Sequence, residues 1–257
     1  MDKIIMSMRE VRKLEKIGMG SESFVYNFND KALKIFNFGC MDETLYENKL
    51  NKVNAISKMD LKNFILPTDY VYTPDDFFIG YAMEKIDTKL DLYSYIKDYE
   101  TSIEDKITML KKYEQLIIDA HKKNILIVDA NFWNCIIMDN NPYIIDTDSF
   151  KIHDLKEDFL PENYETMYLV LNQKKAEANI DFDKFQIGIQ TLGMLIDPKI
   201  ARFNEYFKFK SIIENLNLDE KSYSYFMSLL VPTSNKKYIG DNLDGISSKE
   251  DAFIKRK

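Results

Sequence analysis

The sequence predicts an α+β fold in which a β-rich first third precedes a largely helical remainder. Short apolar runs rich in β-branched and aromatic residues, separated by turn residues, are frequent over residues 13–83. Beyond residue 90 most apolar positions recur with the period of an α-helix. The character changes near residues 84–89, so we predict one domain over residues 1–86 and a second over residues 87–257.

The first predicted domain contains a sheet and one helix. Residues 13–36 have the pattern of a strand, a glycine turn and two further strands, and Asn29 and Asp30 supply a tight turn between the last two. Residues 43–58 place apolar side chains at a helical period. Three more strands are expected at 64–67, 69–72 and 77–83.

The second predicted domain opens with helices and continues with short strands. The helices are expected at 90–98 and 103–123. Ser102 and Asp105 are spaced almost as in a capping box at the start of the longer one. The strands are expected at 125–128, 135–138 and 143–146, with a turn at 140–142. From Phe182 the pattern is helical, with breaks at Pro198 and 232–234, and residues 197–257 contain no motif that indicates a role.

The composition argues against several classes of protein. Hydrophobic residues make up 45% and charged residues 30% of the 257 residues, as in ordinary globular domains. The net charge of -7 argues against a nucleic-acid partner, which requires a basic face. Cys40, Cys135 and two histidines are too few for a disulfide framework or a structural zinc site, and they indicate a reducing, cytoplasmic setting. No apolar run is long enough to span a membrane.

A glycine turn and a lysine form the first candidate site. Gly18 and Gly20 lie between two predicted strands, where glycine allows the backbone to approach a phosphate closely; a plain hairpin is the alternative interpretation. Lys34 lies in the strand that follows, and a surface lysine on a strand edge is the alternative there. Glu47 in the next helix is the expected partner of Lys34, because the neighbouring leucines place its face inward; Glu43 is the other candidate.

The segment Ile127–Ile137 carries the strongest chemical pattern. It contains Asp129 followed five residues later by Asn134, between a long predicted helix and an apolar strand. An aspartate in this position can accept a hydrogen bond, and then a proton, from an attacking hydroxyl. An asparagine can turn back to ligate magnesium and brace the loop.

Two aspartates follow the next hairpin, in the sequence I-I-D-T-D-S-F. Asp148 is the expected magnesium ligand, fourteen residues past Asn134, and Asp146 is the rival for that role. Strand alternation would place both side chains on the same face. Further on, Asp183 opens an apolar helix, where a buried carboxylate would either cap the helix or bind backbone amides of the Asp129 loop.

In this order the segments from about Lys16 to about Leu195 resemble the protein-kinase family. G-M-G-S-E-S-F-V resembles the glycine-rich loop, with Ser23 in place of the third glycine, and A-L-K resembles the strand that carries the phosphate-binding lysine, Lys34. D-A-N-F-W-N resembles the catalytic loop, and D-S-F stands where D-F-G is usual. The resemblance implies a two-lobed kinase-like fold, with a small β-rich N-lobe and a mainly helical C-lobe.

The resemblance also implies the ligands. ATP and Mg²⁺ would be the cofactors, with Mn²⁺ as an alternative metal, and Asn134 and Asp148 would bind the metal. The adenine would lie between Val25, Ala32 and Ile136, and Y-A-M-E-K-I would be the gatekeeper and hinge. The gatekeeper would be Met83, and the backbone of Glu84 and Ile86 would bind the base. Asp129 would be the catalytic base, with Lys34 and Glu47 as its catalytic partners.

Three departures from the family pattern bear on the acceptor. Val128 replaces the arginine that contacts a phosphorylated activation loop, so activity should not depend on that switch. Asn131 replaces the lysine typical of Ser/Thr kinases, and only L-P-E at 160–162 stands near the usual A-P-E. The resemblance favours a divergent, bacterial-type Ser/Thr protein kinase that transfers phosphate to a hydroxyl. A small-molecule kinase of the aminoglycoside or choline type and a nucleotide-binding pseudokinase are the alternatives.

Overall fold

The computed structural model describes residues 1–20, 22–40, 43–88, 90–158, 178–196, 206–231 and 235–247 of the chain. Its backbone contacts divide the chain into two compact units. The first unit is Met1–Thr88 with Ile145–Asp158, and the second is Lys89–Ile144 with Phe159–Lys257. The chain combines a six-stranded sheet with helices, so the predicted mixture of α and β structure is confirmed.

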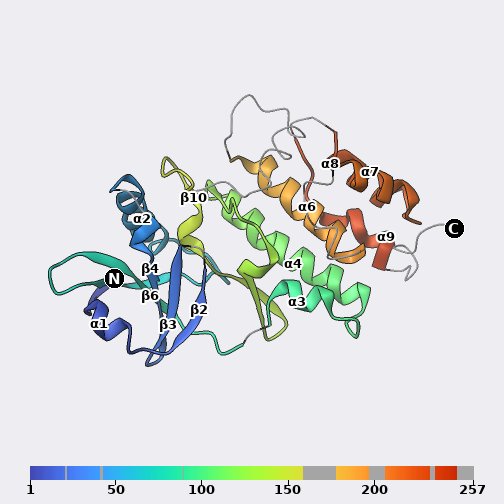
Figure 1. The fold of residues 1–257 in the computed structure, drawn as a ribbon. Helices are drawn as coiled ribbons and strands as arrows, with labels where there is room; N and C mark the ends of the chain where they lie inside the picture. The colour runs from blue at the N-terminus through green and yellow to red at the C-terminus, as the bar shows by residue number, and fades with distance from the viewer. Residues whose placement is uncertain are drawn as a thin grey trace. The chain divides into compact units, whose positions relative to one another are not determined.

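The first unit is built on a sheet with the strand order β1-β5-β6-β4-β3-β2. The strands are β1 (Asp2–Ile5), β2 (Lys16–Met19), β3 (Ser23–Phe28), β4 (Lys31–Phe36), β5 (Pro67–Tyr72) and β6 (Phe78–Glu84) (Figure 1). Only the β1–β5 pair is parallel among these ladders; the other pairs are antiparallel. The central position of β4 places it where side chains from several elements can reach it.

Two details of this sheet differ from the prediction. β1 and the short helix α1 (Met8–Val11) were not expected, because an edge strand with exposed side chains has no apolar alternation to detect. The strands predicted at 64–67 and 69–72 are one strand, β5, which begins at Pro67. Phe64 and Ile65 precede it as buried loop residues, so their apolar character reflects core packing.

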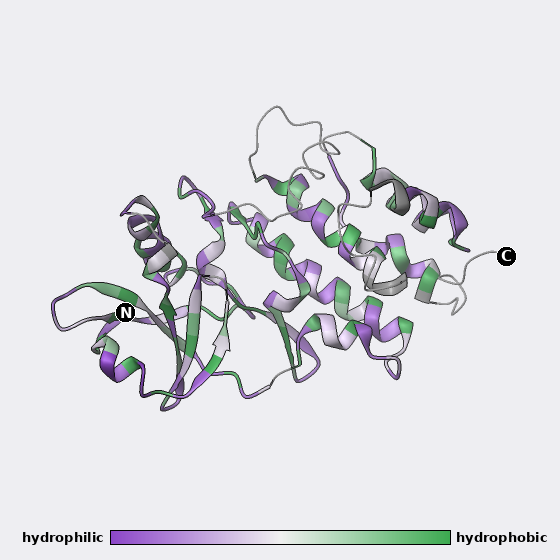
Figure 2. Ribbon diagram, in the orientation of Figure 1, coloured by the Kyte–Doolittle hydropathy of each residue, from purple (hydrophilic) through white to green (hydrophobic). Residues whose placement is uncertain are grey.

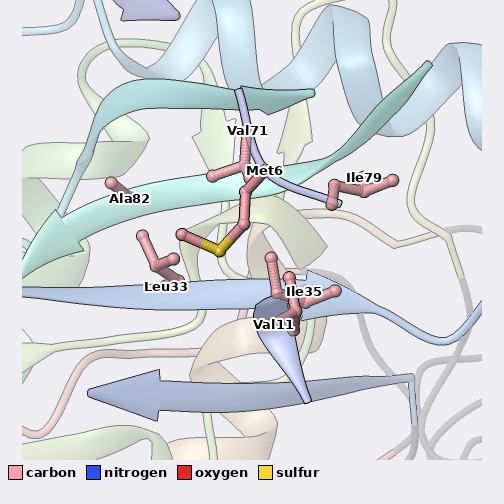
Figure 3. Close-up of a cluster of buried hydrophobic side chains, with 7 residues drawn as sticks. All are labelled: Met6, Val11, Leu33, Ile35, Val71, Ile79 and Ala82. Atoms are coloured by element: carbon pink, nitrogen blue, oxygen red, sulfur yellow. The ribbon is translucent and has the colours of Figure 1, made fainter. Parts of the chain in front are cut away.

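The first unit has two buried hydrophobic clusters: one contains Leu33 and Ile35 of β4, and the other contains Phe36 of the same strand with Val53 of α2 (Glu43–Ile56). Leu33 and Ile35 of β4 pack with residues of β5 and β6 and with Val11 of α1 (Figure 3). Met6, just after β1, extends between Leu33 and Val71 in this close-up. Because these side chains are all buried, the cluster holds β4 in register and so fixes the backbone that carries Lys34.

Gly80 of β6 permits a close approach of two strands at the same point. A Cβ atom added there would lie 2.0 Å from the carbonyl oxygen of Lys34. That distance is far inside van der Waals contact, so any side chain would push β4 away. Glycine at position 80 therefore helps to set the position of the Lys34 backbone.

The remaining elements of the first unit are a helix and short segments around the two aspartates. They are η1 (Phe38–Cys40), α2 (Glu43–Ile56), η3 (Thr147–Ser149) and β10 (Lys151–Ile152). The buried residues of α2 are Lys49, Lys52, Val53 and Ile56. Two lysines thus share the inward face of this helix with two aliphatic residues, which is unusual for a helix of a globular domain.

The second unit is mainly helical in its described residues. Its elements are α3 (Leu92–Lys97), α4 (Ile103–His121), β7 (Ile125–Leu126), η2 (Phe132–Asn134), β8 (Cys135–Met138), β9 (Asn141–Ile144), α6 (Ile180–Ile196), α7 (Tyr206–Asn215), α8 (Glu220–Leu229), η6 (Gly240–Leu243) and α9 (Asp244–Ser247). Ser102 caps α4 and also hydrogen-bonds Asp105, as expected. Hydrophilic and hydrophobic residues alternate along α4 and α6 (Figure 2).

β8 has its predicted bounds, but the turn and the second strand of the β8–β9 hairpin are shifted from their predicted positions. Its turn consists of Asp139 and Asn140, both with positive φ, as two-residue hairpin turns require. Pro142, expected in the turn, lies in β9 opposite Ile137; the ladder has only two strands, so a proline is tolerated there. β9 therefore ends at Ile144, and Asp146 is not a strand residue.

Several predictions fall on residues that the structure does not describe. The L-P-E sequence at 160–162, the break at Pro198 and the break at 232–234 all lie outside the described ranges. Within those ranges no helix combines the length and the apolar character needed to cross a lipid bilayer.

Candidate active site

Lys34 lies at the centre of the charged cluster in the first unit. It occupies β4 between Val25 of β3 and Tyr81 of β6, and its side chain is almost completely buried. Its Nζ atom donates hydrogen bonds to Oδ1 of Asp146 and to Oδ1 of Asp148. Burial alone would lower the pKa of Lys34, but the two carboxylates more than offset this and raise it. The Lys34 side chain is therefore protonated and positively charged at neutral pH.

Asp146 and Asp148 meet Lys34 from a turn, not from a strand. Asp146 has a left-handed backbone with φ of 63°, and Asp148 lies in the 3₁₀ segment η3. The Ser149 hydroxyl donates to the Asp146 carbonyl oxygen at 2.8 Å and supports this turn. The two carboxylates do converge, but the expected reason, alternation along a strand, is wrong because β9 ends before them.

The two carboxylates differ in environment. The Asp148 side chain is 0% exposed and accepts hydrogen bonds from Lys34, from Lys49 Nζ at 2.7 Å and from the Tyr81 hydroxyl at 2.7 Å. The Asp146 side chain is 35% exposed and bonds only to Lys34 among the described residues. Asp148 is thus saturated by protein donors, whereas Asp146 keeps an open side.

The pKa values of the pair reflect this difference. Burial raises the pKa of Asp146 against the opposing effect of Lys34. Burial acts in the same direction on Asp148, but Lys34 and Lys49 overcome it and hold the pKa of that carboxyl well below its usual range. The cluster therefore contains one carboxylate, Asp148, that stays ionised because two ammonium groups surround it.

Glu47 does not take the position predicted for it. It lies on the exposed face of α2, and no ion pair between Glu47 and Lys34 exists in the described part of the chain. The inward face of α2 carries Lys49 instead. Positions 49, 53 and 56 lie on one face of a helix, so the sequence could have placed Lys49 on the buried face with Val53 and Ile56. Leu45 and Leu50 favoured a different face.

Lys49 and Lys52 extend the charged cluster. Lys49 Nζ lies 2.7 Å from Asp158 and 3.1 Å from Glu22, in addition to its contact with Asp148. Lys52 Nζ lies 2.9 Å from Asp158. The burial of these lysines and of Asp158 was not predicted, because a lysine in a helix is ordinarily solvent-exposed.

The predicted nucleotide residues of the first unit lie around β4. Gly18 of β2 faces Val25, and the Gly20 amide donates to the Ser23 carbonyl oxygen at 2.9 Å, which closes the turn. Neither glycine has a positive φ, so neither adopts the left-handed backbone conformation that glycine allows more readily than other residues. Ala32 is buried opposite Met83. The exposed Glu84 ends β6, and the half-buried Ile86 follows it.

A strained turn precedes Asp129 in the second unit. The Asp129 amide donates to the Ile127 carbonyl oxygen at 2.7 Å, and Val128 between them has φ of 65°. A positive φ is costly for a β-branched residue, and a γ-turn of this kind is rare. Strain of about 1–3 kcal/mol persists only where surrounding contacts enforce it, and such residues cluster at functional sites.

The Asp129 carboxylate is oriented by two asparagines. Its Oδ2 atom accepts from Asn131 Nδ2 at 2.7 Å and from Asn134 Nδ2 at 3.0 Å. Asn131 Oδ1 also accepts the Asn134 amide at 3.0 Å. Among the described residues no donor contacts the other oxygen, Oδ1, of Asp129. Burial raises the pKa of Asp129, and the two amide hydrogen bonds offset part of that rise.

Helix α6 holds the backbone of this loop. The fully buried Asp183 accepts the Ile127 amide at 2.8 Å and the Val128 amide at 2.9 Å, so the second of its two predicted roles is confirmed. Gln186 accepts the Ala130 amide at 2.8 Å.

Gln190 completes the same face of α6. It accepts the Phe132 amide at 3.2 Å and donates to the Ala130 carbonyl oxygen at 2.9 Å. The two glutamines were not predicted as site residues. The 183, 186, 190 spacing of polar residues on one face of an otherwise apolar helix was the signal that could have found them.

We expect Asp183→Asn to destabilise the protein by about 2 kcal/mol, since hydrogen bonds to a buried charged acceptor contribute about 1.5–3 kcal/mol. Asparagine keeps one acceptor oxygen but places an NH₂ group against a backbone amide or against His121, which lies 2.8 Å from Asp183. Chemical denaturation measures the change, with Asp139→Asn, at an exposed turn position of the same unit, as control. Equal stability of the two variants would contradict the anchoring role.

The polar residues of the candidate site therefore form two sets. Lys34, Asp146 and Asp148 make one contact cluster in the first unit. Asp129 and Asn134 make another in the second, together with Asn131, which was not predicted as a site residue. The predicted adenine-binding Ile136 is half-buried in β8 of the second unit.

Magnesium was predicted to bind at Asn134 and Asp148. No group of three or more His, Cys, Asp or Glu side chains that could hold a metal occurs in the described ranges. Mg²⁺ does not need such a cage, because it is usually bound by one or two carboxylates together with phosphates and water. The partly exposed carboxylate of Asp146 fits that requirement, and the enclosed carboxylate of Asp148 fits it less well.

Comparisons with known proteins leave the family open. No protein-family model matches the chain, and no protein of curated function matches it either.

Proposed function

We propose that the chain is an ATP- and Mg²⁺-dependent phosphotransferase with a two-lobed, protein-kinase-like fold. The observation that carries the proposal is the contact of one buried cation, Lys34, with two aspartates more than a hundred residues away in the sequence. A lysine beside metal-binding carboxylates is the arrangement that phosphoryl transfer requires, since that reaction depends on positioning and on charge stabilisation.

Lys34 and Asp146 are the residues assigned to the phosphates and the metal. Lys34 would release its carboxylate contact and bind the phosphates, and Asp146 would ligate Mg²⁺. We assign Asp146 in place of Asp148 because its side chain is 35% exposed, against 0% for Asp148. When bound, the metal would offset the charge of the phosphates.

Asp129 is the proposed catalytic base. Asn131 and Asn134 both bind its Oδ2 atom, which leaves Oδ1 to accept the proton of an attacking hydroxyl. The strained turn at Val128 and the α6 contacts keep the carboxylate in one orientation. General-base catalysis of this kind contributes about 10²–10⁴-fold to a rate.

The acceptor we propose is a serine or threonine hydroxyl of a protein. One observation favours a second candidate, a hydroxyl of a small molecule. The I-I-D-T-D sequence resembles that of small-molecule kinases, in which the first of the two aspartates would bind the metal. The first aspartate here is Asp146, and its side chain is more exposed than that of Asp148. Mass spectrometry after incubation with ATP locates the phosphate: labelled Ser or Thr supports the first, and transfer only to small molecules supports the second.

The proposal is tested by transfer of labelled γ-phosphate with Mg²⁺ or Mn²⁺. We expect Lys34→Met to lower transfer by about 10²–10³-fold, the usual effect of removing a charge-stabilising donor. Lys31→Met is the matched control, because Lys31 lies on the same strand and pairs with Asp69 at 2.6 Å. A wild-type protein that transfers no phosphate under any metal supply contradicts the proposal; if it still binds ATP, it is a pseudokinase.

A further inference from the structure

Helix α2 contributes cations to the buried charge cluster of the first unit. Lys49 has a 2% exposed side chain and lies within 3.1 Å of three carboxylates, on Glu22, Asp148 and Asp158. An isolated buried ammonium group would be strongly disfavoured, so these acidic partners are what keep it charged. Burial works against the charged form, but Asp148 and Asp158 prevail and raise the pKa of Lys49.

The three carboxylates come from three different parts of the unit. Glu22 belongs to the glycine turn, Asp148 to η3, and Asp158 to the end of the 145–158 segment. Lys49 therefore connects α2 with the turn and with the segment that carries both candidate metal-binding aspartates. Lys52, one turn further along α2, contacts Asp158 alone among the described acidic residues.

Asp148 has donors that do not depend on Lys34. Lys49 binds its Oδ2 atom, whereas Lys34 and the Tyr81 hydroxyl bind Oδ1. If Lys34 turned toward a phosphate, Asp148 would still be held by Lys49 and Tyr81. Without Lys49, the same movement of Lys34 would leave a fully buried carboxylate with a single neutral donor, which is costly.

We infer that Lys49 is a positioning residue of this site: it holds Asp148, and with it the Asp146 turn, while Lys34 binds the phosphates. The inference rests on the proposed function. The residue of α2 that supports the site is then Lys49, whereas the sequence predicted Glu47 in a supporting role. Lys49 acts through Asp148 and does not itself touch the reacting atoms.

The test compares Lys49→Met with Lys52→Met, a second buried lysine of the same helix. We expect Lys49→Met to lower kcat by about 100-fold, as small displacements of a reacting group do, with a change in KM for ATP of less than about threefold. Lys52→Met should retain kcat within about threefold, because it leaves Asp148 untouched. Equal losses of kcat in the two variants overturn the inference.

A second variant covers the case in which Lys49→Met does not fold. The double variant Lys49→Met with Glu22→Gln removes the lysine together with the partly exposed carboxylate that pairs with it, so one less charge is left unpaired. Its kcat should lie about 100-fold below that of Glu22→Gln alone. A double variant with the kcat of Glu22→Gln overturns the inference.

Thermal unfolding without nucleotide provides a readout that needs no activity. We expect the midpoint to fall further in Lys49→Met than in Lys34→Met, because Lys49 joins three carboxylates from three segments, whereas Lys34 joins two from one turn, of which Asp146 is partly exposed. The reverse order overturns the positioning role. A wild-type protein that transfers no phosphate would refute the proposed function, and this order of midpoints would still decide the role of Lys49.

Discussion

Asp129→Asn is expected to abolish most phosphate transfer, with a loss of about 10²–10⁴-fold in kcat. Asparagine has nearly the same shape and can still accept hydrogen bonds from Asn131 and Asn134. It cannot take a proton from the acceptor hydroxyl. The backbone of the loop is held by Asp183 and Gln186, not by the Asp129 side chain, so the fold should persist.

The measurement is the single-turnover rate of transfer from labelled ATP, together with the affinity for ATP. Affinity should stay within about threefold of wild type, because a group that acts in the transition state contributes little to ground-state binding. Asp139→Asn is the matched control, since Asp139 is an exposed turn residue of the same unit whose positive φ asparagine also tolerates. Wild-type transfer by Asp129→Asn would refute the assignment of the base.

Asp148→Asn is expected to be the most destabilising of the substitutions considered, with a loss of about 3–5 kcal/mol of unfolding free energy. The side chain is 0% exposed and contacts two ammonium groups, Lys34 and Lys49. Removing its negative charge leaves two buried ammonium groups with fewer carboxylate partners. The NH₂ group of the asparagine would also lie against hydrogen-bond donors, where it cannot accept a bond. Urea denaturation measures the loss.

Asp146→Asn is the matched comparison, for which we expect a small loss of stability and a clear loss of phosphate transfer. Its side chain is 35% exposed, so its ion pair with Lys34 is partly screened and should contribute about 1 kcal/mol or less. Phosphate transfer should nevertheless fall and should need more Mg²⁺, because a ligand has been lost. If Asp148→Asn is stable and raises the Mg²⁺ requirement more than Asp146→Asn does, the two roles are reversed.

The parts of the site that the sequence predicted are those encoded within a few residues. Asp129 and Asn134 are five residues apart in one short loop, so their hydrogen bond follows from local chain geometry. The Ser102 cap of α4 is local in the same way. The prediction for Asp183 rested on its place at the start of an apolar helix, where a carboxylate needs donors once it is buried.

The predictions that did not hold depended on which face of an element is buried. Leu45 and Leu50 suggested that Glu47 points inward, yet both are only half-buried and Lys49 occupies the interior. A shift of β9 toward the N-terminus likewise removed Asp146 from the strand predicted to carry it. Rotating a helix or sliding a strand by one or two residues changes every contact while leaving the composition unchanged.

The sequence by itself determined the mixture of a sheet with helices, the glycine turn followed by Lys34, and the Asp129 loop, because periodicity and short-range spacing specify these features. Only the tertiary structure decided which carboxylates surround Lys34, which of Asp146 and Asp148 keeps an exposed side, and that α2 supplies Lys49 to the site. Those outcomes depend on burial and on contacts between residues about a hundred positions apart, and such contacts have no signature in the local pattern of a single chain.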